Sequence, residues 1–182
     1  MPSDVRAANA AAIFEPLDMS GTLMLRSTKG VHPAEPMINP TDKSQLSWLT
    51  SLRTHEGMPL ALRVRPHLDT AANREAFPHL AVITHELEQV TSNGLPADDY
   101  NQSLLQFDLD LQAAVSGGDG GLVLLVETFA GKRSYHGAVA EVAGFESRME
   151  RLRTGYPQHA LTVAVRADKA WTFLERFRSQ FP

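Results

Sequence analysis

Four side chains suited to anion binding stand at alternate positions in two short segments of the chain. Arg63 is two residues from Arg65, and Arg133 is two residues from Tyr135. Because side chains two apart share one face of a β-strand, each pair would lie on one side of a sheet. Guanidinium groups form forked hydrogen bonds with carboxylates and phosphates. If the two faces coincide, the four residues predict a binding surface for a small anionic ligand or a partner protein.

A structural role is the alternative for these arginines. They would then pair with Glu127, with Glu141 or with the C-terminal carboxylate of the same chain. Asp108 and Asp110 stand two apart in a segment of helical periodicity, so their side chains diverge. We expect both aspartates on a solvated helix face.

Histidines and carboxylates support a second hypothesis, an uncharacterised hydrolase or transferase. His79 and His85 belong to one expected strand, and Glu86 could serve either histidine in acid–base chemistry. The segment from His85 to Gln89 has a glutamine where a zinc protease has its second histidine. No serine-hydrolase elbow occurs either. A non-enzymatic binding domain, without a metal ion or cofactor, is therefore the leading prediction.

Composition removes further classes of chemistry. The 182 residues include no cysteine, so disulfides and thiolate chemistry are excluded. The glycine-rich segment 117–121 matches neither a phosphate loop nor the dinucleotide fingerprint, and we expect a turn there. The formal net charge is −4, and Tyr135 is the one aromatic side chain on the strands that would stack bases. We therefore expect no nucleic-acid partner.

The chain shows no targeting or membrane signal. Asp4 offsets Arg6 where a signal peptide would be basic, and no stretch approaches the roughly 18 apolar residues of a membrane-spanning helix. We predict a cytoplasmic protein without membrane contact.

Two regions differ in their patterning. Residues 1–45 form a weakly patterned extension with four of the eleven prolines between Pro16 and Pro40, and residues 46–182 form a single domain. Helices are expected over residues 44–53, from Pro96 to about residue 116, over 144–154 and after Asp168. Strands are expected over residues 60–65, 77–87, 122–126, 133–140 and 159–166, where apolar side chains alternate or run together.

From residue 77 onward this order begins as βαββαβ, the split βαβ of ferredoxin-like α+β sandwiches. The strand at 60–65 would add an extra N-terminal strand, and the last helix would be a C-terminal addition. Two helices would cover one sheet face, while the other is open, covered by the N-terminal residues or used by a partner. A homodimer could form through a sheet edge or through Trp171 and Phe173.

Short segments throughout residues 46–182 resemble the bacterial family of unknown function DUF695. The most specific are the turn Asn93-Gly94-Leu95-Pro96 and the pattern Thr-x-x-Gly-x-Arg-x-Tyr from Thr128 to Tyr135. The resemblance implies a cytoplasmic protein with a ferredoxin-like domain, and it carries no activity, substrate or catalytic residue. A distant similarity of such domains to regulators of ribonuclease E implies a protein partner. Further matching residues are Trp48, Gly57 to Leu60, Arg63 to Arg65, Phe77 to Leu80, Asp108, Tyr156, Pro157, Asp168 and Trp171.

Overall fold

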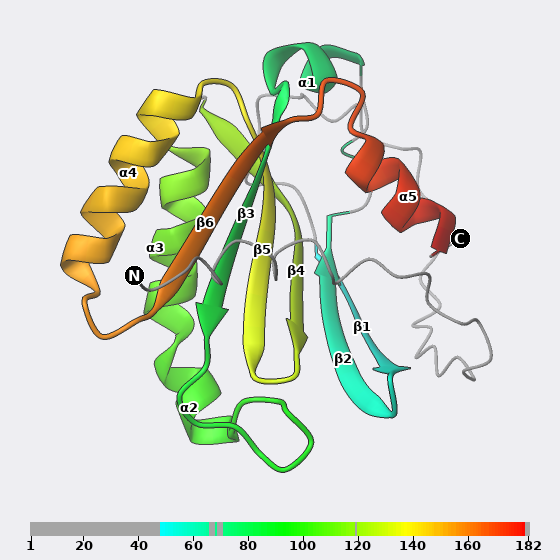
Figure 1. Ribbon diagram of the computed structural model, residues 1–182, viewed down its shortest axis with the longest axis vertical. Helices are drawn as coiled ribbons and strands as arrows, with labels where there is room; N and C mark the ends of the chain where they lie inside the picture. Colours follow the sequence, from blue (N-terminus) through cyan, green and yellow to red (C-terminus); the bar gives the residue numbers. More distant parts are fainter. Residues whose placement is uncertain (1–47, 66–67, 69–70, 119, 181–182) are drawn as a thin grey trace, which may run out of the picture.

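The computed structural model describes residues 48–65, 68, 71–118 and 120–180, and these residues build a six-stranded antiparallel sheet with helices on both faces (Figure 1). The strands are β1 Leu49–His55, β2 Met58–Val64, β3 His79–Glu86, β4 Gly121–Phe129, β5 Lys132–Val139 and β6 Leu161–Ala167. They follow the order β1-β2-β4-β5-β3-β6 across the sheet. The protein is thus an α+β fold, as the alternating and continuous apolar runs predict.

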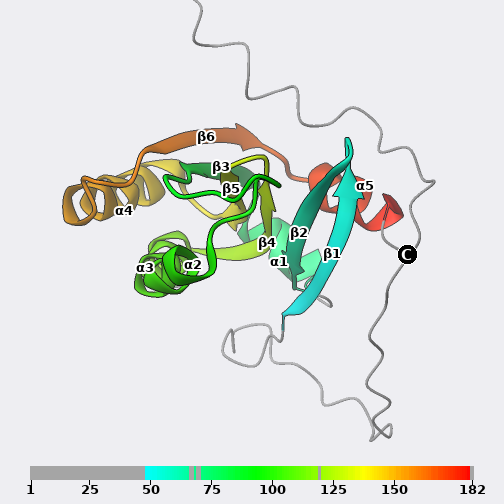
Figure 2. The same cartoon turned by 90° about the horizontal axis from the view of Figure 1, so that it is seen from below.

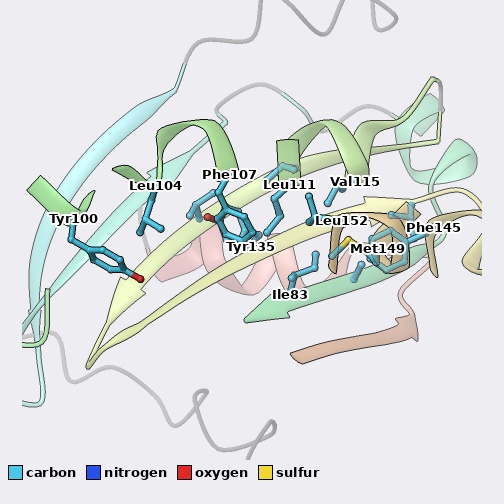
Figure 3. Packing of buried hydrophobic residues seen from close by; sticks show 14 residues of the cluster. Ile83, Tyr100, Leu104, Phe107, Leu111, Val115, Tyr135, Phe145, Met149 and Leu152 are labelled. Carbon is cyan, nitrogen blue, oxygen red and sulfur yellow. The ribbon is translucent and has the colours of Figure 1, made fainter. Parts of the chain in front are cut away.

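The helices are α1 Ala71–Ala76, α2 Asp98–Ser103, α3 Leu105–Ser116, α4 Val142–Gly155 and α5 Thr172–Gln180. Helices α2, α3 and α4 lie on one face of the sheet, where α3 also contacts α4 (Figures 1 and 2). The largest core cluster fills the space between them and the strands. In Figure 3, Phe107 and Leu111 of α3 and Met149 of α4 gather around Tyr135 of β5 and Ile83 of β3. We call this side of the sheet the α3 face.

Helix α5 packs against the opposite face. Its Phe173 and Phe177 bury against leucines of β2, β3 and β4, while Trp171 and Leu174 join a neighbouring apolar cluster. The helix begins where Asp168 accepts hydrogen bonds from the backbone amides of Thr172 and Phe173, as its position before the predicted helix suggests. Because Trp171 and Phe173 are buried within their own chain, they are not the dimer surface considered from the sequence.

One irregularity interrupts the register of β4 against β5. Val123 pairs with Gly137, but the next residue of β5, His136, pairs with Leu125. Leu124 is therefore the extra residue of a β-bulge. Both Leu124 and Leu125 contribute to the clusters on the α5 side, whereas Val126 returns to the α3 face.

The helix expected over residues 44–53 is wrong where the structure describes it. Residues 49–55 are instead β1, which forms a hairpin with β2 through Glu56 and Gly57. Both turn residues have positive φ, 50° and 76°, as tight hairpin turns require. Two strands therefore extend the sheet at this edge, not one. Residues 44–47 and the proposed extension over 1–45 lie outside the described residues.

Within the described residues, no helix is long and apolar enough to cross a membrane. The cytoplasmic location stays a prediction.

Candidate functional site

The register of the sheet brings three of the four predicted site residues onto the α3 face. Arg63 of β2 pairs with Val126 of β4, which pairs with Tyr135 of β5. Paired residues of antiparallel strands point to the same side. Arg133, two residues before Tyr135, therefore shares that side, and so does Arg63.

Asp108 of α3 is the centre on which these side chains converge. Arg133 Nη1 lies 2.7 Å from Asp108 Oδ2, and Arg63 Nη2 lies 3.5 Å from the same oxygen. The Tyr135 hydroxyl donates a hydrogen bond to Asp108 Oδ1. The side chains of Asp108 and Arg133 are only 8% and 7% exposed. We call these four residues the Asp108 cluster.

Arg133 is held at every guanidinium nitrogen. Besides its bond to Asp108, its Nε donates to the Thr128 hydroxyl at 3.2 Å, and its Nη2 donates to Asn101 Oδ1. Thr128 stands opposite Arg133 in the β4–β5 ladder. Asn101 comes from α2, which ends one turn before α3 brings in Asp108. The short break at Leu104 thus lets two consecutive helices supply polar groups to one arginine.

Burial fixes the protonation state of Tyr135. The loss of solvent around its ring, followed by the nearby Asp108 charge, raises the pKa of the phenol far above its usual range. The hydroxyl therefore remains a donor at neutral pH. It supplies Asp108 with a buried partner that adds no charge.

The sequence pattern hid the role of Asp108. We expected Asp108 on a solvated helix face, but the structure buries it. Asp110, the other aspartate, accepts a hydrogen bond from the more accessible Tyr156 hydroxyl. The carboxylates expected to pair with the arginines lie elsewhere: Glu127 is 3.3 Å from His136, and Glu141 caps α4. The position of Asp108 in the helical pattern was a signal of its burial. It falls four residues after Leu104 and three before Leu111, within the apolar stripe of the helix.

Arg63 and Arg65 form the rim of the cluster. The Arg63 side chain remains 35% exposed. The Arg65 guanidinium lies 4.5 Å from the centre of the Trp48 ring, and that of Arg63 lies 5.9 Å from it, so the indole supports both cations. The predicted four-residue surface thus divides into a buried pair, Arg133 and Tyr135, and a half-buried pair, Arg63 of β2 and Arg65 just after that strand.

A buried histidine adjoins the cluster. His85 pairs with Arg133 across β3 and β5, and its ring contacts Phe107 at 4.8 Å and His159 at 4.7 Å between centroids. Among the described residues, neither ring nitrogen has a hydrogen-bond partner. Desolvation, with the neighbouring His159 and Arg133, lowers the pKa of His85 to about 4. The imidazole is therefore neutral at pH 7.

The structure does not bring Glu86 to His79 or His85. Neighbours in a strand point to opposite faces, so Glu86 turns away from His85. Glu86 instead lies 3.1 Å from Lys132, and His79 stands at the far end of β3. In the described part of the chain, no group of three or more histidine and acidic side chains is placed to hold a metal ion.

A loop and a hairpin brace the strand that carries Arg133 and Tyr135. The Gly131 amide donates to the Gly94 carbonyl at 2.8 Å, and the Leu87 amide donates to the Gly131 carbonyl at 2.8 Å. A Cβ on Gly94 would lie 3.0 Å from Cα of Ala130. The turn at Asn93–Pro96 and the β4–β5 turn, the two most specific segments of the resemblance, are therefore packed together.

These observations define an α+β domain whose α3 face holds a buried Asp–Arg–Tyr cluster with accessible arginines at its rim. The model of a family of unknown function (DUF695) matches residues 47–177. The chain belongs to this family, which confirms the resemblance noted in the sequence. No curated protein and no solved structure matches the chain.

Proposed function

We propose that the protein is a non-enzymatic binding domain that takes a carboxylate or phosphate group at the rim of the Asp108 cluster. The observation that carries this proposal is a mismatch of charge. Two guanidinium groups, those of Arg63 and Arg133, share the single carboxylate of Asp108. Arg65 lies beside Arg63, against the same Trp48 ring.

The two shared arginines differ in how much Asp108 satisfies them. Arg133 has a short ion pair with Asp108 and hydrogen bonds to Thr128 and Asn101, whereas Arg63 contacts the carboxylate only at 3.5 Å. Among the described residues, the Arg63 guanidinium therefore keeps donors available, and its side chain is partly exposed. An incoming anion would meet Arg63 and Arg65 on one strand face, with Trp48 beneath them.

The ferredoxin-like assignment of the fold is part of the same proposal. It is supported by the order β6-β3-β5-β4 within the sheet. In that order α2 and α3 connect β3 to β4 across β5, and α4 connects β5 to β6 across β3. The hairpin of β1 and β2 extends the sheet beyond α3 (Figure 2), so the part of the α3 face that carries Arg63 is the part suited to a ligand.

The experiment is a thermal-shift and calorimetric titration of three proteins: wild type, Arg63→Ala and Arg151→Ala. Arg151 is an exposed arginine of α4 and serves as the matched control. Inorganic phosphate, citrate, free glutamate and a glutamate-rich peptide are the probes. A site-bound anion at 100 times its Kd stabilises the folded protein by about 2.7 kcal/mol. We expect this gain in wild type and Arg151→Ala, and its loss in Arg63→Ala.

The probes also separate the sources of the anion. A response to phosphate or citrate assigns the site to a small ligand, and a response to the peptide alone assigns it to a partner protein. Salts such as phosphate also stabilise proteins by exclusion from the surface, which acts on all three proteins alike. Equal shifts in all three, or no shift with any probe, would contradict the proposal.

A further inference from the structure

Strand β6 ends the sheet with one long side unpaired. In the described sheet its one neighbour is β3. The strand sequence, Leu161 to Ala167, contains no proline and a single charged residue, Arg166. A strand edge of this kind is a template for pairing with another strand.

Backbone hydrogen bonds identify which residues face the open side. The Asp168 amide donates to the Pro78 carbonyl, and the Glu86 amide donates to the Ala160 carbonyl. Bonded positions alternate along an antiparallel ladder. The even-numbered residues of β6 therefore bond to β3, and the N–H and C=O groups of Leu161, Val163, Val165 and Ala167 point to the open edge.

A groove along this edge is lined by residues of β6 and α4, the two elements at the left of the sheet in Figure 1. Its volume is about 780 Å³, and Met149, Val163 and Val165 contribute its apolar lining. These valines carry side chains on the α3 face and are half-buried. A partner strand laid along β6 would complete their burial.

The charges of the groove differ between its ends. Arg153 Nη2 donates to the Leu161 carbonyl at 3.4 Å, which places this arginine at the start of β6. Glu146 belongs to the other half of α4 and lines the end near His79 and Ala167. Arg153 and Glu146 thus place opposite charges toward the two ends of the groove; Arg153 also lies 3.6 Å from Glu150 of its own helix, and Arg166 lines the groove near Ala167.

We propose that two copies of the chain pair through β6 to form a homodimer. A two-fold axis at Ala164 aligns the whole of both strands, with Leu161 opposite Ala167 and Val163 opposite Val165 of the second copy. All of these are residues whose backbone groups face the open edge. The axis also exchanges the ends of the groove, so Arg153 of each copy faces Glu146 of the other.

Self-complementarity favours a second copy over an unrelated peptide. A two-fold interface must match its own surface in reverse. The valines are symmetric about Ala164, and the opposite charges stand on opposite sides of it. The dimer leaves the anion site accessible, because β2 and β6 lie at different parts of the sheet, separated by β4, β5 and β3. Failure of one proposal is therefore distinguishable from failure of the other.

Sedimentation equilibrium of the full chain tests the dimer. Val163→Pro removes an N–H that faces the open edge and no bond to β3, so we expect a folded monomer. Arg153→Glu and Glu146→Arg each place like charges together, and each should raise the dimer Kd at least about tenfold. The double variant Arg153→Glu/Glu146→Arg restores opposite charges and should recover dimerisation.

Arg151→Glu, on an exposed position of the same helix, is the matched control and should stay dimeric. If Val163→Pro does not fold, the charge variants alone test the dimer. Recovery of dimerisation in the double variant would show that the single variants act at the interface, because a folding defect would not be repaired by a second substitution. A wild-type protein that is monomeric at about 1 mM, where even a millimolar Kd would be visible, overturns the proposal. So does a dimer that none of these substitutions weakens.

Discussion

Arg133 and Asp108 form a 2.7 Å ion pair although 25 residues separate them in the chain. One residue belongs to the sheet and the other to the helical layer above it. Through Asn101 and Thr128, the same guanidinium also reaches α2 and β4. The Asp108 cluster therefore joins two helices and two strands through one arginine.

Removal of the central carboxylate should be costly. Asp108→Asn leaves the buried charge of Arg133 without its counter-ion, and breaking a buried pair in this way typically costs about 3–5 kcal/mol. Asp110→Asn, two residues away on α3, removes a carboxylate whose partners are Tyr156 and Gln106 and should cost about 1 kcal/mol or less. Urea unfolding of both variants measures the difference. Similar losses for the two would contradict the central role of Asp108.

Tyr135→Phe should reveal coupling within the cluster. Loss of the hydroxyl removes one hydrogen bond to a charged acceptor, with an expected cost of about 1.5–3 kcal/mol. In an Asp108→Asn background the same change should cost less, because the charged acceptor has already gone. A double-mutant cycle with a coupling energy near zero would show that the two side chains act independently.

Acid should destabilise the protein through His85. Its pKa in the folded protein is about 4, below the value of about 6.5 in the unfolded chain. The unfolded state therefore binds the proton more readily, so the stabilisation is complete above pH 6.5 and is lost as pH falls toward 4. His85→Leu should flatten this fall, as measured by urea midpoints at about pH 7.5 and about pH 4.5. His55→Gln, in the β1–β2 hairpin, should retain the wild-type difference.

The contact between the Asn93–Pro96 turn and the β4–β5 turn can be tested with two glycines. Gly94 and Gly57 have similar backbone angles, with φ of 80° and 76°, but only a Cβ on Gly94 meets another residue. Gly57→Ala should lower the free energy of unfolding by about 1–2 kcal/mol, because alanine is strained in the left-handed conformation. Gly94→Ala should add to this strain an overpacking loss of about 1–3 kcal/mol against Ala130. Equal losses of unfolding free energy would show that the two turns can separate freely.

Gly117 should be intolerant of a side chain for a different reason. A Cβ there would lie 2.4 Å from Cδ of Arg148, whose Nε donates to the Ala114 carbonyl at 2.7 Å. Gly117→Ala should therefore cost about 1–3 kcal/mol, whereas Gly155→Ala, with open space around it, should be nearly neutral. In an Arg148→Ala background, Gly117→Ala should cause a smaller loss of unfolding free energy, because the side chain that its Cβ meets has been removed. An unchanged loss would show that it arises from the backbone conformation at Gly117.

Much of the fold was predictable because local patterns and tertiary structure agree. The alternation at residues 60–65 and 159–166, and the apolar run at 122–126, correspond to β2, β6 and β4. The prediction of a helix at 44–53 was wrong because leucines three residues apart are compatible with two structures. They share one side of a helix, and they alternate between the two faces of a strand. Leu49 and Leu52 are in fact exposed on an edge strand. The Glu56-Gly57 turn, not the leucine spacing, decides this segment.

The candidate site was predictable only in part. Period-two spacing placed Arg133 with Tyr135, and the relation of those two to Arg63 followed once the strand register was known. The counter-ion was not predictable in the same way, because the distance between α3 and β5 is set by apolar packing around Phe107 and Leu111. The sequence signals for it were the position of Asp108 within an apolar stripe and its place among the residues that match the family.

The extra residue in β4 takes up one position of sequence without changing the pairing on either side of it. Val123 opposite Gly137 and Leu125 opposite His136 are consecutive pairs of the ladder, so deletion of Leu124 would leave both halves of the strand in register and on their present faces. The deletion would remove one side chain from the apolar cluster that holds Trp171 and Leu174. The bulge is therefore the place at which β4 can change its length by one residue while Thr128 stays opposite Arg133.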